Sequence, residues 1–140
     1  MLHDLDFHNT THALTSTIGR PLGDTSNAGW VPSSGDYLCL MLDEVVPDDS
    51  DYISTTSVGS TCNLSLNPTT YPGTEYQKLK YRASSTTGNS LIIRLVNGTT
   101  TIRSQTQALT PIDSEYTITL TPGEIAAVTS GYFSVELESA

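Results

Sequence analysis

Residues 76–84 read YQKLKYRAS, and this stretch decides the fold class. The apolar and aromatic residues Leu79, Tyr81 and Ala83 alternate here with three basic residues. Successive side chains of a β-strand point to opposite faces of the sheet, so a period of two gives one buried face and one solvated face. Such alternation is typical of antiparallel sheets, which can face solvent on one side. The stretch therefore predicts a half-buried strand of an all-β protein.

Segments of the same kind recur along the chain from residue 36 onward. In YTITL at residues 116–120 and YFSVELE at residues 132–138, apolar or aromatic positions again alternate with polar ones. The NGT at residues 97–99 lies between two strand-like runs and predicts a hairpin. The predicted strands are residues 36–46, 51–56, 61–66, 76–84, 90–97, 99–108, 115–120 and 131–138. Strands spaced by about ten residues predict an antiparallel β-sandwich of about eight strands, with a jelly roll as its expected form.

One short helix is predicted between the last two strands, in TPGEIAAVTSG at residues 121–131. Thr121 suits the N-cap, Pro122 the first helical position and Glu124 the position three residues after the cap. Gly131 is a stop signal. The predicted helix covers residues 122–130 and connects two strands.

The first 25 residues differ from the rest of the chain. They contain all three histidines and show no sustained hydrophobic period. A segment with few apolar residues cannot hold one shape by itself. We therefore expect residues 1–25 to form an extended N-terminal arm and residues 26–140 to form the sandwich domain, with Trp30 anchoring the junction. The apolar residues expected to bind the arm to a neighbouring subunit are Leu2, Leu5, Phe7, Leu14, Ile18 and Leu22.

Charge and composition exclude some classes of partner. The chain carries a formal net charge of −9, and nucleic acid is not expected as a partner because phosphate binding needs Lys and Arg. Residues 1–51 are acidic and five of the six bases fall between residues 78 and 103, so copies could complement one another, or the surface could simply be acidic. No apolar run is long enough for a membrane span, and the start lacks the pattern of a secretory signal.

The two cysteines, Cys39 and Cys62, are predicted to remain thiols. In DYLCLMLDE, residues 36–44, strand alternation would place Leu38, Leu40 and Leu42 on one face and Cys39 on the other. Cys62 alternates with leucines and is expected to point inward. These directions do not favour a disulfide, as expected for a chain made in a reducing cytosol.

Two groups of residues raise the question of a metal. Asp48, Asp49 and Asp51 lack the spacing, the glycine and the final glutamate of a calcium-binding loop, so a solvated turn is the preferred interpretation and a cation the alternative. His3, His8 and His12 could in principle bind zinc, but they lie in the predicted arm. No cofactor is expected. No nucleophile, histidine and acid occur in a pattern with catalytic logic, so an enzyme is not expected.

The ordered series of motifs resembles a family of small virion proteins of tailed bacteriophages. The resemblance is carried by GWVPSSGDYLCLMLDEVVPDDSDYIS at residues 29–54, then YQKLKYRAS, then SLIIRLVNGTTTI at residues 90–102. It covers roughly residues 29–138. It implies a β-sandwich structural component of the particle, with a head decoration (cement) or tail-associated role and no catalytic residues.

These observations lead to a functional hypothesis for the chain. We expect a non-enzymatic virion protein, assembled in the host cytoplasm, that decorates the capsid and stabilises the shell by binding the major capsid protein. Many copies, expected as homotrimers, would each bury a modest interface on a fixed lattice. The alternative is a tail- or fibre-associated module that recognises a host surface glycan through exposed aromatic residues such as Tyr37, Tyr52 and Tyr71.

Overall fold

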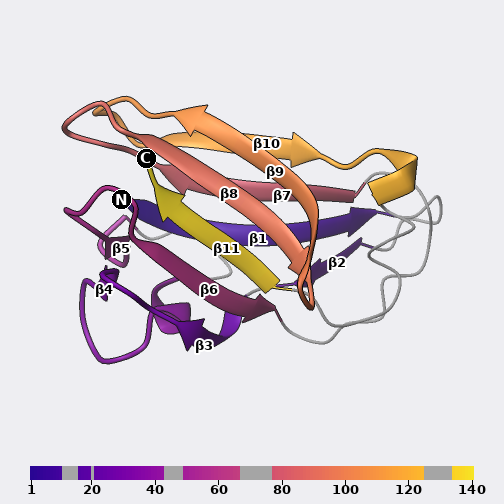
Figure 1. Cartoon of the computed structure of the whole chain (residues 1–140), viewed down its shortest axis with the longest axis horizontal. Coiled ribbons are helices and arrows are strands. Elements are labelled where there is room, and N and C mark those ends of the chain that lie inside the picture. The colour runs from indigo at the N-terminus through magenta and orange to yellow at the C-terminus, as the bar shows by residue number, and fades with distance from the viewer. Residues whose placement is uncertain (11–15, 20, 43–48, 67–76, 125–133) are drawn as a thin grey trace.

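The computed structural model describes residues 1–10, 16–19, 21–42, 49–66, 77–124 and 134–140, in which two antiparallel sheets pack face to face (Figure 1). This confirms the predicted all-β sandwich. No helix of these ranges is long and apolar enough to cross a membrane.

The larger sheet has six strands among the described residues. Its order is β10 (Ser114–Thr119), β7 (Gln77–Ala83), β1 (Leu2–Thr10), β5 (Ile53–Ser54) and β4 (Val31–Pro32), and β2 (Ser16–Gly19) pairs with the second half of β1. The β7 strand, from which the sequence analysis began, lies between β10 and β1. Its Leu79, Tyr81 and Ala83 are buried, as their alternation predicts.

The second sheet has five strands within the described ranges. Its order is β3 (Pro21–Ser26), β6 (Thr61–Leu66), β11 (Ser134–Ser139), β8 (Ser90–Asn97) and β9 (Thr100–Ala108). The chain passes repeatedly from one sheet to the other, so most hydrogen-bonded neighbours are distant in sequence. Gly98, at φ +61°, forms the turn of the predicted hairpin between β8 and β9.

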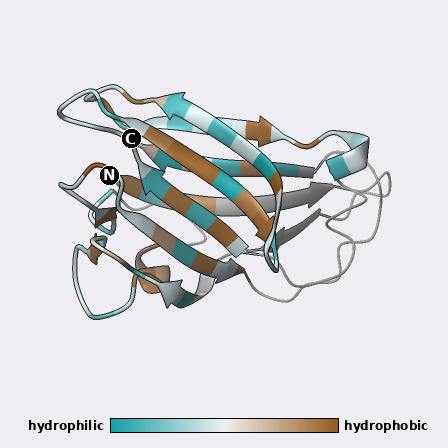
Figure 2. Ribbon diagram, in the orientation of Figure 1, coloured by the Kyte–Doolittle hydropathy of each residue, from teal (hydrophilic) through white to brown (hydrophobic). Residues whose placement is uncertain are grey.

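The core lies between the sheets and is built from every second residue of the strands. Figure 2 shows the resulting alternation of brown and teal along β6 and β11, whereas β8 is brown over most of its length. The buried residues of these three strands are Cys62, Leu64, Leu66, Leu91, Ile93, Leu95, Val135 and Leu137. Burial of this apolar surface supplies the main favourable free energy of folding.

The N-terminal residues correct the prediction of an arm outside the domain. Leu2–Thr10 form β1, an interior strand of the six-stranded sheet that pairs with β7 along its length. The register shifts between Leu2 and Asp4, so His3 is the extra residue of a β-bulge. The bulge puts Leu2 and Leu5, three residues apart, both into the core, where neither can contact another subunit. The missing period that suggested an arm is the signature of this bulge.

The other proposed arm residues lie elsewhere. Phe7, Ile18 and Leu22 belong to β1, β2 and β3, so the strands continue through most of the predicted arm. Leu14 lies outside the described residues. Trp30, the expected anchor of the domain, is buried in the core, and its Nε1–H donates to the carbonyl oxygen of Ser60 at 3.0 Å.

The predicted strand at residues 36–46 is also wrong over residues 36–42, and residues 43–46 lie outside the described ranges. Cys39–Met41 form a short 3₁₀ helix, η1, with Leu38 and Leu42 buried at its ends and Leu40 exposed. The carboxylate of Asp24 in β3 accepts hydrogen bonds from the backbone N–H groups of Leu38 (2.6 Å) and Cys39 (2.8 Å). These bonds satisfy amides at the start of the helical turn and favour it over an extended strand.

The predicted helix begins where the sequence places it. Helical structure starts at Pro122, and the remainder of the 122–130 helix lies outside the described residues. The backbone N–H of Glu124 donates to Thr121 Oγ1, and the N–H of Thr121 donates to Glu124 Oε1. This reciprocal pair is a capping box, as the spacing predicts.

Candidate functional site

A cavity of about 510 Å³ opens at the end of the sandwich where the two chain termini lie (Figure 1). It is lined by residues around Met1 and Trp30, by the segment after β5, by the loop at residues 84–90 between β7 and β8, and by Ser139 of β11. Its size falls within the usual range of small-molecule sites.

The chemistry of this lining is unusually uniform. Ten of the fourteen lining residues are Ser, Thr or Asn, and the other four are Met1, Trp30, Leu91 and Leu109. No lining side chain carries a charge. Below, this cavity is called the Ser/Thr pocket. It offers many small groups that can both donate and accept hydrogen bonds, beside an apolar surface that makes up more than half of the lining.

The loop at residues 84–90 is held by its own hydrogen bonds and by its neighbours. The N–H of Ser84 donates to the carbonyl of Met1, and the N–H of Ser85 donates to the carbonyl of Thr110. Ser85 Oγ accepts from the N–H of Asn89, and Gly88 takes a φ of +73° at the turn. The wall of the Ser/Thr pocket is therefore formed before any ligand arrives.

Trp30 reaches the pocket because the residue before it is a glycine. Gly29 has a φ of +82°, and a Cβ there would lie 2.5 Å from Ser60 Oγ. Only glycine accepts this backbone conformation and close approach without strain. The turn directs the indole toward Ser60 and the pocket lining.

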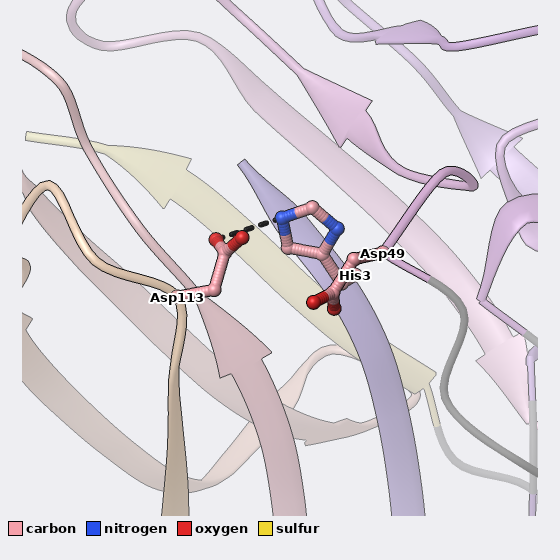
Figure 3. Close-up of side chains that lie close together, drawn as sticks. All are labelled: His3, Asp49 and Asp113. Atoms are coloured by element: carbon pink, nitrogen blue, oxygen red, sulfur yellow. Dashed lines mark ion pairs between the residues drawn. The ribbon is translucent and has the colours of Figure 1, made fainter.

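A second group of polar residues lies around the β-bulge of β1 (Figure 3). His3 is 1% exposed, and its Nε2 lies 2.8 Å from an oxygen of Asp113. Ligand atoms of His3, Asp49 and Asp113 all lie within 4.8 Å of one another. The Nε2 and the Asp113 oxygen are within ion-pair distance, but their geometry is not that of a directed hydrogen bond. Together with Arg82, these residues are called the His3 cluster.

The ion pair of Arg82 with Asp49 determines whether the His3 cluster is suited to bind a metal ion. The Arg82 guanidinium donates to both carboxylate oxygens of Asp49, at 2.7 and 2.9 Å. This bidentate pair lowers the pKa of the Asp49 carboxyl, chiefly through the hydrogen bond from Arg82. One imidazole nitrogen and two carboxylates could hold a divalent cation. However, Arg82 already neutralises one carboxylate, so the arrangement fits an ion-pair group that ties β1 to two loops better than a metal centre.

The structure describes part of the acidic stretch predicted to form a solvated turn. Residues 49–50 form a turn, and Asp49 contacts Arg82 rather than the other aspartates. Asp51 is half-buried beside this turn, whereas Asp48 lies outside the described residues. His8 belongs to β1 and His12 lies outside the described residues, so the zinc alternative remains an untested hypothesis.

The basic segment pairs with acids of the same chain. Lys80 contacts Glu115, and Arg103 contacts Glu124. Arg94 on β8 bridges two carboxylates of the adjacent β11, Glu136 and Glu138, at 2.7 Å each. These three bases therefore pair with acids of residues 115–138 and not with the acidic residues 1–51.

The two cysteines do not form a disulfide, and both are buried. Burial raises the pKa of the Cys62 thiol to about 12. Burial likewise raises the pKa of Tyr81, whose ring stacks on Tyr116 at a centroid distance of 5.4 Å, to about 12. Tyr81 and Cys62 are thus protonated core residues at neutral pH, with no thiolate available for nucleophilic chemistry.

Three large apolar side chains are exposed within the segment from β4 to η1. Val31 is 57% exposed, Tyr37 59% and Leu40 53%. They lie in one segment that runs from β4, at the edge of the larger sheet, to η1, which is bound to β3 at the edge of the smaller sheet. We call these three residues the apolar side.

Sequence reasoning did not find the Ser/Thr pocket or the His3 cluster. Both combine one of the first three residues with residues more than eighty positions later, and the interpretation of residues 1–25 as an arm removed these residues from the domain. The STTGNS loop and the bulged LHDL stretch were the available signals. No protein-family model matches the chain, and neither the curated proteins nor the solved structures searched contain a match.

Proposed function

We propose that this protein is a non-enzymatic structural component of a tailed-bacteriophage particle that decorates the capsid and stabilises the shell by binding the major capsid protein. The ordered motifs of residues 29–102 support the virion assignment through their resemblance to such proteins. The β-sandwich fold agrees with that resemblance. The localisation that follows is the virion, after assembly in the host cytoplasm.

The single observation that carries the docking proposal is the apolar side. Exposed apolar residues scattered singly are ordinary, but three large ones within ten residues of the chain favour a protein contact. The occupant is the shell surface, because a decoration protein must present one fixed face to a repeated lattice. This face replaces the N-terminal anchors expected from the sequence, since Leu2 and Leu5 lie in the core.

The segment that carries the apolar side is held in place by contacts of Ser33 with Tyr52 and Met41. The N–H of Ser33 donates to the carbonyl of Tyr52, and Ser33 Oγ accepts from the N–H of Tyr52 while contacting the sulfur of Met41. Met41 itself is buried. A surface held in this way loses little conformational entropy on docking.

The first experiment measures abundance in purified particles by quantitative mass spectrometry. A copy number close to that of the major shell protein is expected for a decoration protein. A few copies per particle would favour the tail-associated role, and absence from the particle would overturn the proposal. The homotrimer, still a prediction, is tested by the solution mass of the purified protein.

The second experiment tests the face. We expect the variant Val31→Ser/Tyr37→Ser/Leu40→Gln to keep its melting temperature but to lose co-sedimentation with shells that lack this protein. The matched control is Val58→Ser/Ile112→Ser, which removes side chains that are 69% and 76% exposed outside this segment. Equal binding by the triple variant and the wild type would refute docking through the apolar side.

A further inference from the structure

We infer that the Ser/Thr pocket binds an uncharged saccharide. This inference goes beyond the proposed function and does not depend on it, because the pocket and the apolar side share no residue. Nothing about shell binding requires a preformed cavity of about 510 Å³ at the end of the sandwich.

The lining chemistry selects the class of ligand. Nine of the fourteen lining residues are Ser or Thr, compared with 39 of 140 in the whole chain, so the enrichment exceeds the general bias of the composition. A hydroxyl group donates one hydrogen bond and accepts others, which matches a ligand whose own groups do the same. Saccharide hydroxyls have this property at every ring position.

Other ligand classes fit less well. The lining has no Lys, Arg or His side chain to neutralise an anion and no Asp or Glu to bind a cation. Its one charged group is the Met1 α-ammonium, which already donates to the carbonyl of Ser84 and whose pKa is lowered by burial. A wholly apolar ligand would strip water from the hydroxyls without replacing their hydrogen bonds. A neutral molecule with many hydroxyl groups brings no unpaired charge into the pocket and replaces the hydrogen bonds that the lining hydroxyls lose to water.

The apolar part of the lining completes the site. Met1 and Leu109 contribute aliphatic surface on which the C–H face of a sugar ring can pack, whereas Trp30 and Leu91, which are 6% and 2% exposed, contribute little of it. Asn89 adds an amide with two donors and one acceptor oxygen. Because the loop at residues 84–90 is already hydrogen-bonded in place, the pocket needs little ordering on binding.

Trp30 also provides the measurement, because it is the only tryptophan of the chain and lines the pocket. The experiment titrates full-length protein with D-glucose, D-galactose, D-mannose and N-acetyl-D-glucosamine and follows tryptophan fluorescence. We expect at least one sugar to give a saturable change with a dissociation constant of about 1 mM, a value reasonable for a ligand of this size. A glycan array then extends the ligand to longer chains.

Paired variants separate the pocket from a general effect on the protein. Thr56 and Thr86 are exposed lining residues, so Thr56→Val/Thr86→Val removes two hydroxyls at nearly constant volume without disturbing the core. The control, Thr101→Val/Thr106→Val, makes the same change on β9 outside the lining. We expect at least a tenfold weaker affinity for the pocket variant only, with unchanged melting temperatures for both.

The outcomes are decisive in either direction. Saturable binding that weakens in the pocket variant and not in the β9 control supports the inference. No saturable change with any of the four sugars and no glycan bound on the array would overturn it, as would equal affinities in the two variants. Loss of shell binding by the apolar-side variant has no bearing on either result.

Discussion

The carboxylate of Asp24 determines the conformation of the segment around η1. Asp24 accepts hydrogen bonds from the N–H groups of Leu38 and Cys39, and residues that alternate like a strand become a 3₁₀ turn instead. The alternating sequence pattern favours a strand here, but hydrogen bonds between residues fourteen and fifteen positions apart stabilise the helical turn instead.

We therefore expect Asp24→Ala to lower the free energy of unfolding by about 2 kcal/mol, since two hydrogen bonds to a charged group are lost and buried amides remain. Asp24→Asn, which keeps one strong acceptor, should lie between the alanine variant and the wild type. Chemical denaturation measures the difference. Asp36→Ala, at an exposed position, is the control and should change stability little. Identical stabilities for Asp24→Ala and the wild type would show that the cap is dispensable.

At the same scale, burial sets the reactivity of Cys62. Its thiol pKa of about 12 leaves almost no thiolate at pH 8. In a Cys39→Ala background, where Cys62 is the only cysteine, we expect an aromatic disulfide reagent to label the protein only after denaturant unfolds it. Rapid stoichiometric labelling of the folded variant would contradict the buried placement.

At the scale of elements, β1 is the strand on which the larger sheet depends. It pairs with β7 on one side and with β2 and β5 on the other, and Leu5 is 0% exposed. An arm that lay on another subunit could be changed without affecting the domain, whereas an interior strand could not.

Leu5→Ala distinguishes these cases. We expect a loss of about 2–5 kcal/mol in the free energy of unfolding, from the lost apolar burial and the cavity that remains. Val58→Ala removes an exposed side chain and should change stability by no more than about 0.5 kcal/mol. Thermal and chemical unfolding measure the stabilities of both variants. A Leu5→Ala variant as stable as the Val58→Ala control would support the prediction that residues 1–25 form an arm outside the domain.

The sequence predicted the strands from β5 onward well and missed β1 to β4 and η1. β6 and β8 begin and end at the predicted residues, because turn residues flank both strand-like runs. β1 was missed because the bulge at His3 interrupts its period, and η1 because Asp24 caps it from another strand. The capping box at Thr121 was predictable because it is local, whereas the Ser/Thr pocket assembles from distant segments.

At the scale of the whole molecule, the acidic chain distributes its few bases among its own carboxylates. Arg82 lowers the pKa of Asp49 from its ordinary value of 3.8, so this pair stabilises the folded state when the pH is above 3.8. As the pH falls through the lower folded-state pKa, Asp49 becomes protonated and that contribution is lost.

The decrease of protein stability at acidic pH tests the contribution of the Arg82–Asp49 pair. We expect Arg82→Gln, which returns the Asp49 pKa toward its ordinary value, to lose less stability than the wild type as the pH falls below about 4. Melting temperatures between pH 7 and pH 2 measure the two curves. Parallel curves would show that the exposed pair makes no contribution to the acid sensitivity of the protein.

The two chain ends lie at the same pole of the molecule, with residue 1 bonded to Ser84 and residue 140 to Ser90 (Figure 1). A short glycine-rich linker between them would give a closed polypeptide that can be reopened elsewhere, and the Gly98–Thr99 turn is a suitable place for new ends. A purification tag fused to either end would, by the same arrangement, stand over the hydroxyl-lined cavity. Cargo displayed on such a scaffold should therefore be inserted at the opposite pole.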